Sequence, residues 1–180
     1  GMQMKKVLDN VSCSFESGKF YSILGQSGSG KTTLLSLLSG LDTIEEGDIL
    51  YNGESIKKIG YNKYRNSYVN IIFQSYNLIP YMTAYENVEV ALDIAGIKLN
   101  KEDKKEKILS TLNELGIDNS AAFRTVLKLS GGEQQRVAIA RCLVTDIPFI
   151  MADEPTGNLD EDTEKKIIDI FKKLAKQGKG

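Results

Sequence analysis

Residues 25–31 bring together three glycines, two serines and a lysine between an apolar run and a leucine-rich run. With Thr32 they fulfil the pattern G-x-x-x-x-G-K-[ST], in which glycines leave successive backbone N–H groups free to turn toward one anion. The start of a helix adds its dipole, Lys31 can reach the outer phosphate oxygens of a nucleotide, and the Thr32 hydroxyl can bind Mg²⁺. The predicted phosphate cradle consists of Gly25, Gln26, Ser27, Gly28, Ser29, Gly30, Lys31, Thr32 and Thr33. A glycine-rich turn without a ligand is the alternative.

Two adjacent carboxylates, Asp153 and Glu154, follow the apolar run FIMA. If this run is a parallel strand, both carboxylates lie at its carboxyl end, the edge where ligands gather in such sheets. Asp153 is then expected near the Mg²⁺ held by Thr32, and Glu154 near the terminal phosphate, where it can polarise a water molecule. An Asp-Glu pair by itself is more often a helix cap or a loop, and the cradle is what favours the catalytic interpretation.

A third group of polar residues opens the segment LSGGEQQRVAIAR. Ser130 and Glu133 have the spacing of a capping box, while Gly131 and Gly132 leave the first N–H groups of the expected helix uncovered for an anion. The segment therefore predicts a second phosphate-binding site. A well-capped helix whose glycines only permit close packing is the alternative.

Strands and helices that position these residues follow from the apolar pattern. The expected strands are at 20–24, 69–73 and 147–152, the last of them buried. The expected helices begin at Lys31, run from Thr83 to Gly96 and over 101–116, begin again at Ser130, and cover 161–175. This alternation predicts an α/β fold, with a parallel-sheet nucleotide core and a helical insertion at about 77–145.

The pair Asn52-Gly53 lies between two short strand-like segments and predicts an antiparallel hairpin with a type I′ turn. The charge run KEDKKEK is expected on a solvated helix face. The residues expected to face inward on the helices are Leu34, Leu35, Leu37, Leu38, Leu41, Ile108, Leu112, Leu115, Ile167, Ile168, Phe171 and Leu174.

The composition limits the classes of function. A chain of 180 residues with 41% apolar content suits one globular domain, and its net charge of −1 offers no global field for nucleic acid or an anionic membrane. Cys13 and Cys142, with no histidine in the chain, form neither a disulfide framework nor a metal-ligand cluster, which favours a reduced, cytosolic compartment. The apolar runs are too short to span a membrane. Gly1 before Met2 is interpreted as a cloning remnant.

With these neighbours, LSGGEQQRVAIAR resembles the signature of the ATP-binding cassette (ABC) ATPases, and the resemblance extends along essentially the whole chain. It implies a P-loop NTPase (RecA-like) parallel-sheet core with an antiparallel β subdomain and an α-helical subdomain. It also implies ATP and Mg²⁺ as cofactors, and hydrolysis by a head-to-tail dimer. In such a dimer Ser130 and Gly132 of one chain close over the nucleotide held by residues 25–33 of a second copy.

Two further residues take their roles from this resemblance. Gln74 looks like the Q-loop glutamine that senses Mg²⁺ and the attacking water and couples to a partner, which makes it both a catalytic and a metal-site candidate beside Lys31 and Glu154. Asp160 looks like the D-loop aspartate at the dimer interface, although a loop that caps the next helix is the equally natural local interpretation. Arg136 and Arg141 are interpreted as exposed charges without a role in the site.

The stretches FQSYNLIPYMTAYENVEVAL and MADEPTGNLD are similar to the bacterial subgroup that serves lipoprotein release, macrolide export and antimicrobial-peptide export or resistance. This implies an ATPase subunit that powers separately encoded transmembrane permease subunits from the cytoplasmic face of the membrane, with peptide or lipopeptide cargo by analogy. An ATP-dependent regulatory clamp that signals to a membrane partner without transport is the alternative. A role on nucleic acid is not expected, because Gln74 and Ser130 are too close in sequence for a coiled-coil insertion and no basic stripe is present.

Two features depart from the family pattern. The chain has no histidine, whereas the resemblance implies a switch histidine on a strand after the last helix. An aromatic residue that stacks on adenine is expected before Met2, and Phe15 and Tyr21 do not match it. The domain at 2–180 is therefore expected to be truncated at both ends, to bind nucleotide weakly and to hydrolyse it slowly.

Overall fold

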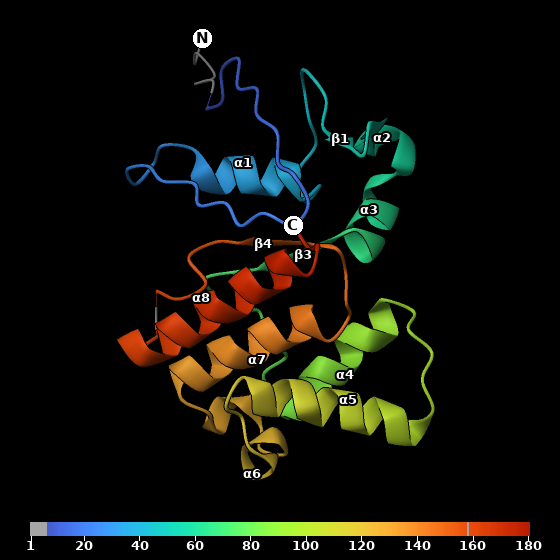
Figure 1. Ribbon diagram of the computed structural model, residues 1–180, viewed down its shortest axis with the longest axis vertical. Coiled ribbons are helices and arrows are strands. Elements are labelled where there is room, and N and C mark those ends of the chain that lie inside the picture. The colour runs from blue at the N-terminus through green and yellow to red at the C-terminus, as the bar shows by residue number, and fades with distance from the viewer. Residues whose placement is uncertain (1–6, 158) are drawn as a thin grey trace.

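The computed structural model describes residues 7–157 and 159–180. Two parallel strands, β3 (Val69–Ile72) and β4 (Phe149–Ala152), lie at the centre of the molecule (Figure 1). A long, mostly helical crossover joins them, which is the connection that parallel strands require. The α/β organisation expected from the sequence is therefore observed.

The two strands are in register over their full length. The ladder continues past β4, because the N–H of Asp153 donates to Ile72 O at 2.9 Å. Parallel strands that are in register end at the same edge of the sheet. Gln74 and the carboxylates of Asp153 and Glu154 are thereby brought to one edge, as expected.

Residues 20–24 form no strand in the described structure, so the first expected strand is wrong. The side chain of Leu24 is 88% exposed. A cavity of about 480 Å³ lies between this segment and β4, lined by Phe20 on one side and Met151 on the other. The apolar run alone favoured a strand, but a strand also needs a neighbour for its backbone groups.

The edge of β4 that faces this cavity is paired with the end of the chain instead. Gly180 donates its N–H to Pro148 O at 3.0 Å and accepts from the N–H of Ile150 at 2.9 Å. These bonds occupy the Pro148 carbonyl and the Ile150 N–H on this edge of β4. No backbone–backbone hydrogen bond joins residues 20–24 to any other segment that the structure describes.

Helix α1 (Lys31–Leu38) follows the glycine loop, as predicted. Strands β1 (Leu50–Tyr51) and β2 (Glu54–Ser55) then form the expected antiparallel hairpin. Its two-residue turn has φ of 49° at Asn52 and 82° at Gly53, the positive values that a type I′ turn requires.

Two helices not predicted from the sequence follow the hairpin, α2 (Ile56–Ile59) and α3 (Tyr61–Ser67). Together with α1 they build a small apolar cluster around Ile56 and Tyr64 on one side of the strand pair (Figure 1). The Tyr64 hydroxyl donates to Leu38 O at 3.0 Å, and burial raises its pKa to about 12. Tyr64 therefore ties α3 to the end of α1.

The other side of the strand pair carries the main core, built from helices between about 77 and 145 (Figure 1). They are α4 (Ala84–Ile94), α5 (Lys101–Glu114), α6 (Asn119–Ala122), a 3-10 helix η1 (Val126–Lys128) and α7 (Gly131–Leu143). The capping box that starts α4 is observed, and Gly96 has the positive φ of 69° expected after a helix end.

The predicted inward residues have mixed outcomes. Ile108, Leu112 and Leu115 are buried in the main core as expected. On α1 no residue is fully buried, and Leu41 is 47% exposed, so its predicted inward position is wrong. Leu41 lies beyond the end of α1, after Gly40 with its φ of 70°. Leu35 and Leu38 border the cavity as well as the small cluster, whereas Ile108 and Leu112 of α5 are covered by the main core.

Helix α8 (Glu161–Lys176) is the last helix of the described residues, and its bounds agree with the predicted ones to within a residue. Ile167 is buried, while Ile168, Phe171 and Leu174 are half-buried and line the cavity. Strand β4 is also less buried than expected, with only Met151 buried. No helix within residues 7–157 and 159–180 is long and apolar enough to cross a membrane.

Candidate functional site

The glycine loop before α1 has the backbone expected of a phosphate cradle. Gly28 and Gly30 have φ of 78° and 90°, in the left-handed region that glycine enters at little cost. Gly30 is the N-cap of α1 and no side chain caps the helix, so the first N–H groups of α1 are open to an outside acceptor. A helix start of this kind is suited to an anion.

Lys31 bends back over the loop that precedes it. Its ammonium donates to Gly25 O at 2.8 Å and to Gln26 O at 2.9 Å. An ammonium has three donors, so these carbonyls hold it over the loop while leaving capacity for an anion. The positive charge therefore lies at the cradle.

Thr32 and Asp153 meet although they are 121 positions apart in the sequence. The Thr32 hydroxyl donates to Asp153 Oδ2 at 3.1 Å. Hard oxygen ligands of this kind fit Mg²⁺, which usually takes one or two protein groups and completes its shell with water and phosphate oxygens. In the described part of the chain, no group of three His, Cys, Asp or Glu side chains could hold a metal by itself. Thr32 and Asp153 therefore suit a metal ion whose remaining ligands come from phosphate and water.

Gln74 and Glu154 meet at the same edge of the sheet. The Gln74 amide Nε2 donates to Glu154 Oε2 at 2.9 Å. Glu154 has a φ of 47°, which costs a residue with a Cβ about 1–2 kcal/mol. Such backbone strain persists where the surrounding structure imposes it and is concentrated at functional sites. The geometry directs the Glu154 carboxylate toward the loop that follows β3.

The start of α7 has the predicted capping box. Ser130 Oγ accepts from the Glu133 N–H at 3.2 Å, and Glu133 Oε2 accepts from the Ser130 N–H at 2.7 Å. The Ser130 N–H is the main reason that the pKa of Glu133 lies below its usual range. The N–H groups of Gly131 and Gly132 have no hydrogen-bond partner within the described residues and remain available to an anion.

Within one chain, the start of α7 is not joined to the cradle. No hydrogen bond or ion pair of the described structure links Ser130, Gly131 or Gly132 to residues 25–33. The structure thus joins Thr32 to Asp153 and Gln74 to Glu154, while Lys31 bonds the carbonyls of its own loop. No hydrogen bond joins Gly131 or Gly132 to these residues within the described part of the chain.

Asp160 caps α8, as the local interpretation of its loop predicted. Its carboxylate accepts from the Thr163 N–H at 3.0 Å and from the Thr163 hydroxyl at 2.6 Å. These two bonds, led by the hydroxyl, lower the pKa of Asp160. A role of Asp160 between two chains stays a prediction.

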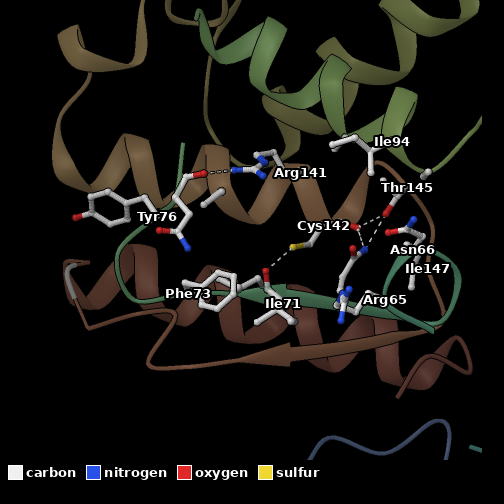
Figure 2. A pocket seen from close by; sticks show the side chains of 16 residues that line it. Arg65, Asn66, Ile71, Phe73, Tyr76, Ile94, Arg141, Cys142, Thr145 and Ile147 are labelled. Carbon is white, nitrogen blue, oxygen red and sulfur yellow. Dashed lines mark hydrogen bonds between the residues drawn. The ribbon is translucent and has the colours of Figure 1, made fainter. Parts of the chain in front are cut away.

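Arg141 was interpreted as an exposed charge, and the structure corrects this. Its guanidinium Nη1 donates to Asn77 O at 2.5 Å, in the loop that follows Gln74 (Figure 2). Burial lowers the pKa of Arg141, which is half-buried. One sequence signal could have shown this, because Arg141 lies one helical turn after the buried Val137 and therefore on the same face of α7.

The sequence matches the protein family described as ABC transporter over residues 8–157. It is 52% identical over 169 residues to the "uncharacterized ABC transporter ATP-binding protein YclH" of Bacillus subtilis (strain 168), covering 94% of this chain and 74% of that protein. It is 39% identical over 180 residues to the "lipoprotein-releasing system ATP-binding protein LolD" of Saccharophagus degradans, covering 98% of this chain and 78% of that protein.

Two solved structures are similar along nearly the whole chain. One is described as a dimeric structure of MJ0796, a bacterial ABC transporter cassette, with a TM-score of 0.90 and 36% identity, covering 98% of this chain and 80% of that chain. The other is a dimeric post-hydrolysis state of MJ0796 bound to ADP and Pi, with a TM-score of 0.92 and 36% identity, covering 99% and 79%.

Proposed function

Because this chain belongs to the ABC transporter family, as its ATP-binding component, we propose that it hydrolyses ATP as a head-to-tail dimer and thereby powers transport by membrane subunits. Its fold is the P-loop NTPase fold of the ABC cassettes, as expected from the sequence. The observation that carries the proposal is the contact of Thr32 with Asp153, which joins the phosphate cradle to the carboxylate edge of the sheet.

In the proposed mechanism the cradle binds the phosphates of ATP. The open N–H groups at the start of α1 and the Lys31 ammonium neutralise phosphate charge. Thr32 and Asp153 are the residues that would hold Mg²⁺, which when bound supplies further neutralisation of the phosphate oxygens. The Lys31 ammonium has a third N–H besides the two that bond the Gly25 and Gln26 carbonyls, and this donor would bind a phosphate oxygen.

Glu154 is proposed as the group that orients the attacking water and accepts its proton. A carboxylate in this role contributes about 10²–10⁴-fold to the rate. Gln74 donates to Glu154 and so holds its carboxylate in place, next in the chain to Asp153, which with Thr32 would hold the metal. Hydrolysis then releases ADP and phosphate from the cradle.

A second copy of the chain is proposed to complete the site. The N–H groups of Gly131 and Gly132 have no partner in the described part of one chain, although the capping box holds the start of α7 in a fixed geometry. In a head-to-tail pair, Ser130 and these glycines would bind the phosphates held by the partner's cradle, with Asp160 at the interface. The dimeric cassettes that this chain resembles support the proposal.

The transport role is proposed from similarity to the lipoprotein-releasing ATPase. The permease subunits would be separate chains, and this chain would lie at the cytoplasmic face of the membrane beside them. The cargo class proposed is a lipoprotein, lipopeptide or peptide. ATP-dependent cargo flux in vesicles that contain the membrane partner would distinguish transport from a purely regulatory clamp.

The dimer is tested with Glu154→Gln, which keeps the shape of the side chain and removes its ability to accept a proton. Light scattering during gel filtration is expected to show a monomer alone and a dimer with MgATP, because hydrolysis no longer opens the pair. Glu154→Gln combined with Lys31→Ala is the control, expected to stay monomeric because the cradle loses its cation. A Glu154→Gln chain that binds ATP and remains monomeric would contradict the proposed dimer.

A further inference from the structure

The loop after β3 has an unusual backbone. Tyr76 and Asn77 are consecutive residues with φ of 49° and 50°. Asparagine tolerates this left-handed region, but for a bulky aromatic residue such as tyrosine it is uncommon. Contacts elsewhere must therefore hold the loop in this conformation.

Both left-handed residues contact α7. The carbonyl of Asn77 accepts from Arg141 Nη1 at 2.5 Å. The hydroxyl of Tyr76 lies over the start of the same helix, where a Cβ added to Gly131 would approach it to 3.1 Å. Figure 2 shows the Arg141 side chain extending from α7 toward this loop.

Among the residues that the structure describes, Arg141 has no carboxylate partner. It lines a cavity of about 160 Å³ together with Asn66, Ile94 and Thr145, and none of the described side chains that line this cavity is acidic. Its one described hydrogen bond is the bond to the Asn77 carbonyl. Because the half-buried Arg141 guanidinium has no described ion pair, its bond to the Asn77 carbonyl is the main charge-assisted contact of the loop.

Helix α7 is itself fixed on β3, so it offers Arg141 a rigid base. Asn70 Nδ2 donates to Cys142 O and to Thr145 Oγ1, each at 2.8 Å, and the Cys142 thiol donates to Ile71 O at 3.5 Å. Figure 2 shows these contacts between the strand and the helix. The loop therefore begins at the end of β3 and is bonded at Asn77 to α7, and these two elements are held together by the bonds just described.

We propose that Arg141 is a positioning residue for ATP hydrolysis: by holding the Asn77 carbonyl, it fixes the loop from which Gln74 reaches Glu154. This inference rests on the proposed ATPase function. Gln74 lies only three residues before Asn77, so displacement of the loop moves the amide that contacts the Glu154 carboxylate. Misplacement of a catalytic group by about 1 Å can lower a rate on the order of 10²-fold.

The test is a double-mutant cycle on kcat. Arg141→Met keeps the aliphatic stem and removes the donors, and it is expected to lower kcat about 10-fold with the KM for ATP changed less than about 2-fold. In a Gln74→Ala background the same substitution is expected to have no further effect, because the positioned group is already gone. Arg141→Lys, which keeps one donor, is expected to recover part of kcat. Equal losses of kcat in both backgrounds would overturn the proposal.

Arg65→Met is the matched control. Arg65 is also half-buried, lines the same cavity, and donates through Nη1 to a backbone carbonyl, that of Gly40, at 2.5 Å. If removal of any half-buried guanidinium lowers kcat, Arg65→Met and Arg141→Met will both show that loss. The effect of Arg65→Met is expected to be the same with and without Gln74→Ala.

Amide hydrogen exchange gives a readout that does not depend on catalysis. Arg141→Met is expected to speed exchange in residues 74–78 at least 10-fold, while Arg65→Met leaves that segment unchanged. Unchanged exchange of residues 74–78 in Arg141→Met would overturn the positioning role. Absence of ATP hydrolysis by the unaltered chain would instead contradict the proposed function. The exchange experiment would still show whether Arg141 holds the loop at residues 74–78.

Discussion

At the scale of single residues, the site consists of polar groups that already hold one another. Lys31 is held by Gly25 and Gln26 carbonyls, and Thr32 by the Asp153 carboxylate. Each of these bonds occupies a group that the proposed chemistry needs for phosphate or metal. Preorganisation of this kind reduces the reorganisation that binding requires, because the groups exchange one oxygen partner for another.

The Thr32 hydroxyl can be tested with Thr32→Val, which keeps the shape of the side chain and removes its oxygen. ATP hydrolysis is expected to fall by about 10²-fold or more and to need a higher Mg²⁺ concentration, because a proposed metal ligand and its bond to Asp153 are both lost. Steady-state hydrolysis measured across a Mg²⁺ titration checks this. Thr32→Ser keeps the hydroxyl and is expected to retain most of the activity. Equal loss in both variants would count against a metal-binding role.

At the scale of elements, capping decides where several helices begin. Thr83 and Ser130 each form a full capping box, while Asn100, Asp118 and Asp160 cap through single side-chain oxygens. Such caps satisfy N–H groups that have no partner inside the helix, at about 1 kcal/mol each. The starts of α1, α3 and η1 have no side-chain cap, and the start of α1 is the one proposed to bind phosphate.

The capping box of α4 predicts a pH dependence of stability. Glu86 accepts from the Thr83 N–H at 2.7 Å and from its hydroxyl at 2.9 Å, and these bonds lower the pKa of Glu86 from its ordinary 4.5. Because the folded-state pKa is the lower one, the ionised form stabilises the protein above the unfolded-state pKa. That contribution is lost as the pH falls through the folded-state pKa.

Glu86→Gln is therefore expected to lower the midpoint of urea denaturation at neutral pH, with the difference from the unaltered chain closing as the pH falls below about 5. Midpoints followed by circular dichroism at a series of pH values measure this. Thr83→Ala should weaken the same pH dependence, because it removes one of the two donors. A difference that stays constant down to pH 4 would show that ionisation of Glu86 does not contribute.

At the scale of the whole molecule, the strand pair divides two unequal cores. The larger core is covered by α4, α5 and α7, whereas the smaller is built around Ile56 and Tyr64 and borders the open cavity beside β4. The site lies at the carboxyl edge of the strand pair, between these two cores. Helix α7 connects the larger core to this edge through Arg141 and the loop after Gln74.

The reactivity of the two cysteines can be used to test the packing of α7 on β3. Cys13 is exposed, whereas Cys142 is buried between α7 and β3, and burial raises the pKa of its thiol to about 12. A thiol reagent is expected to label one cysteine in the folded chain and both after denaturation, since the thiolate is the reactive form. Counting labelled thiols by absorbance checks this. In Cys13→Ser the folded chain should remain unlabelled, and rapid labelling there would contradict the packing of α7 on β3.

Much of the fold could be predicted because its signals are local. The Asn52-Gly53 turn, the capping boxes at Thr83 and Ser130, and the apolar spacing of α5 each depend on residues a few positions apart. A dihedral preference or an i, i+3 hydrogen bond acts within one element whatever surrounds it. The sequence by itself therefore determined where most elements begin and which residue types reach the carboxyl edge of the sheet.

Only the tertiary structure decided which of these groups meet. The bonds of Thr32 to Asp153 and of Gln74 to Glu154 span 121 and 80 positions, and they exist because β3 and β4 pair in parallel and in register. Residues 20–24 have an apolar pattern that favours a strand, yet they form none, because no other described segment pairs with their backbone. Pairing and burial depend on which distant segment packs alongside, and no local pattern in one segment contains that information.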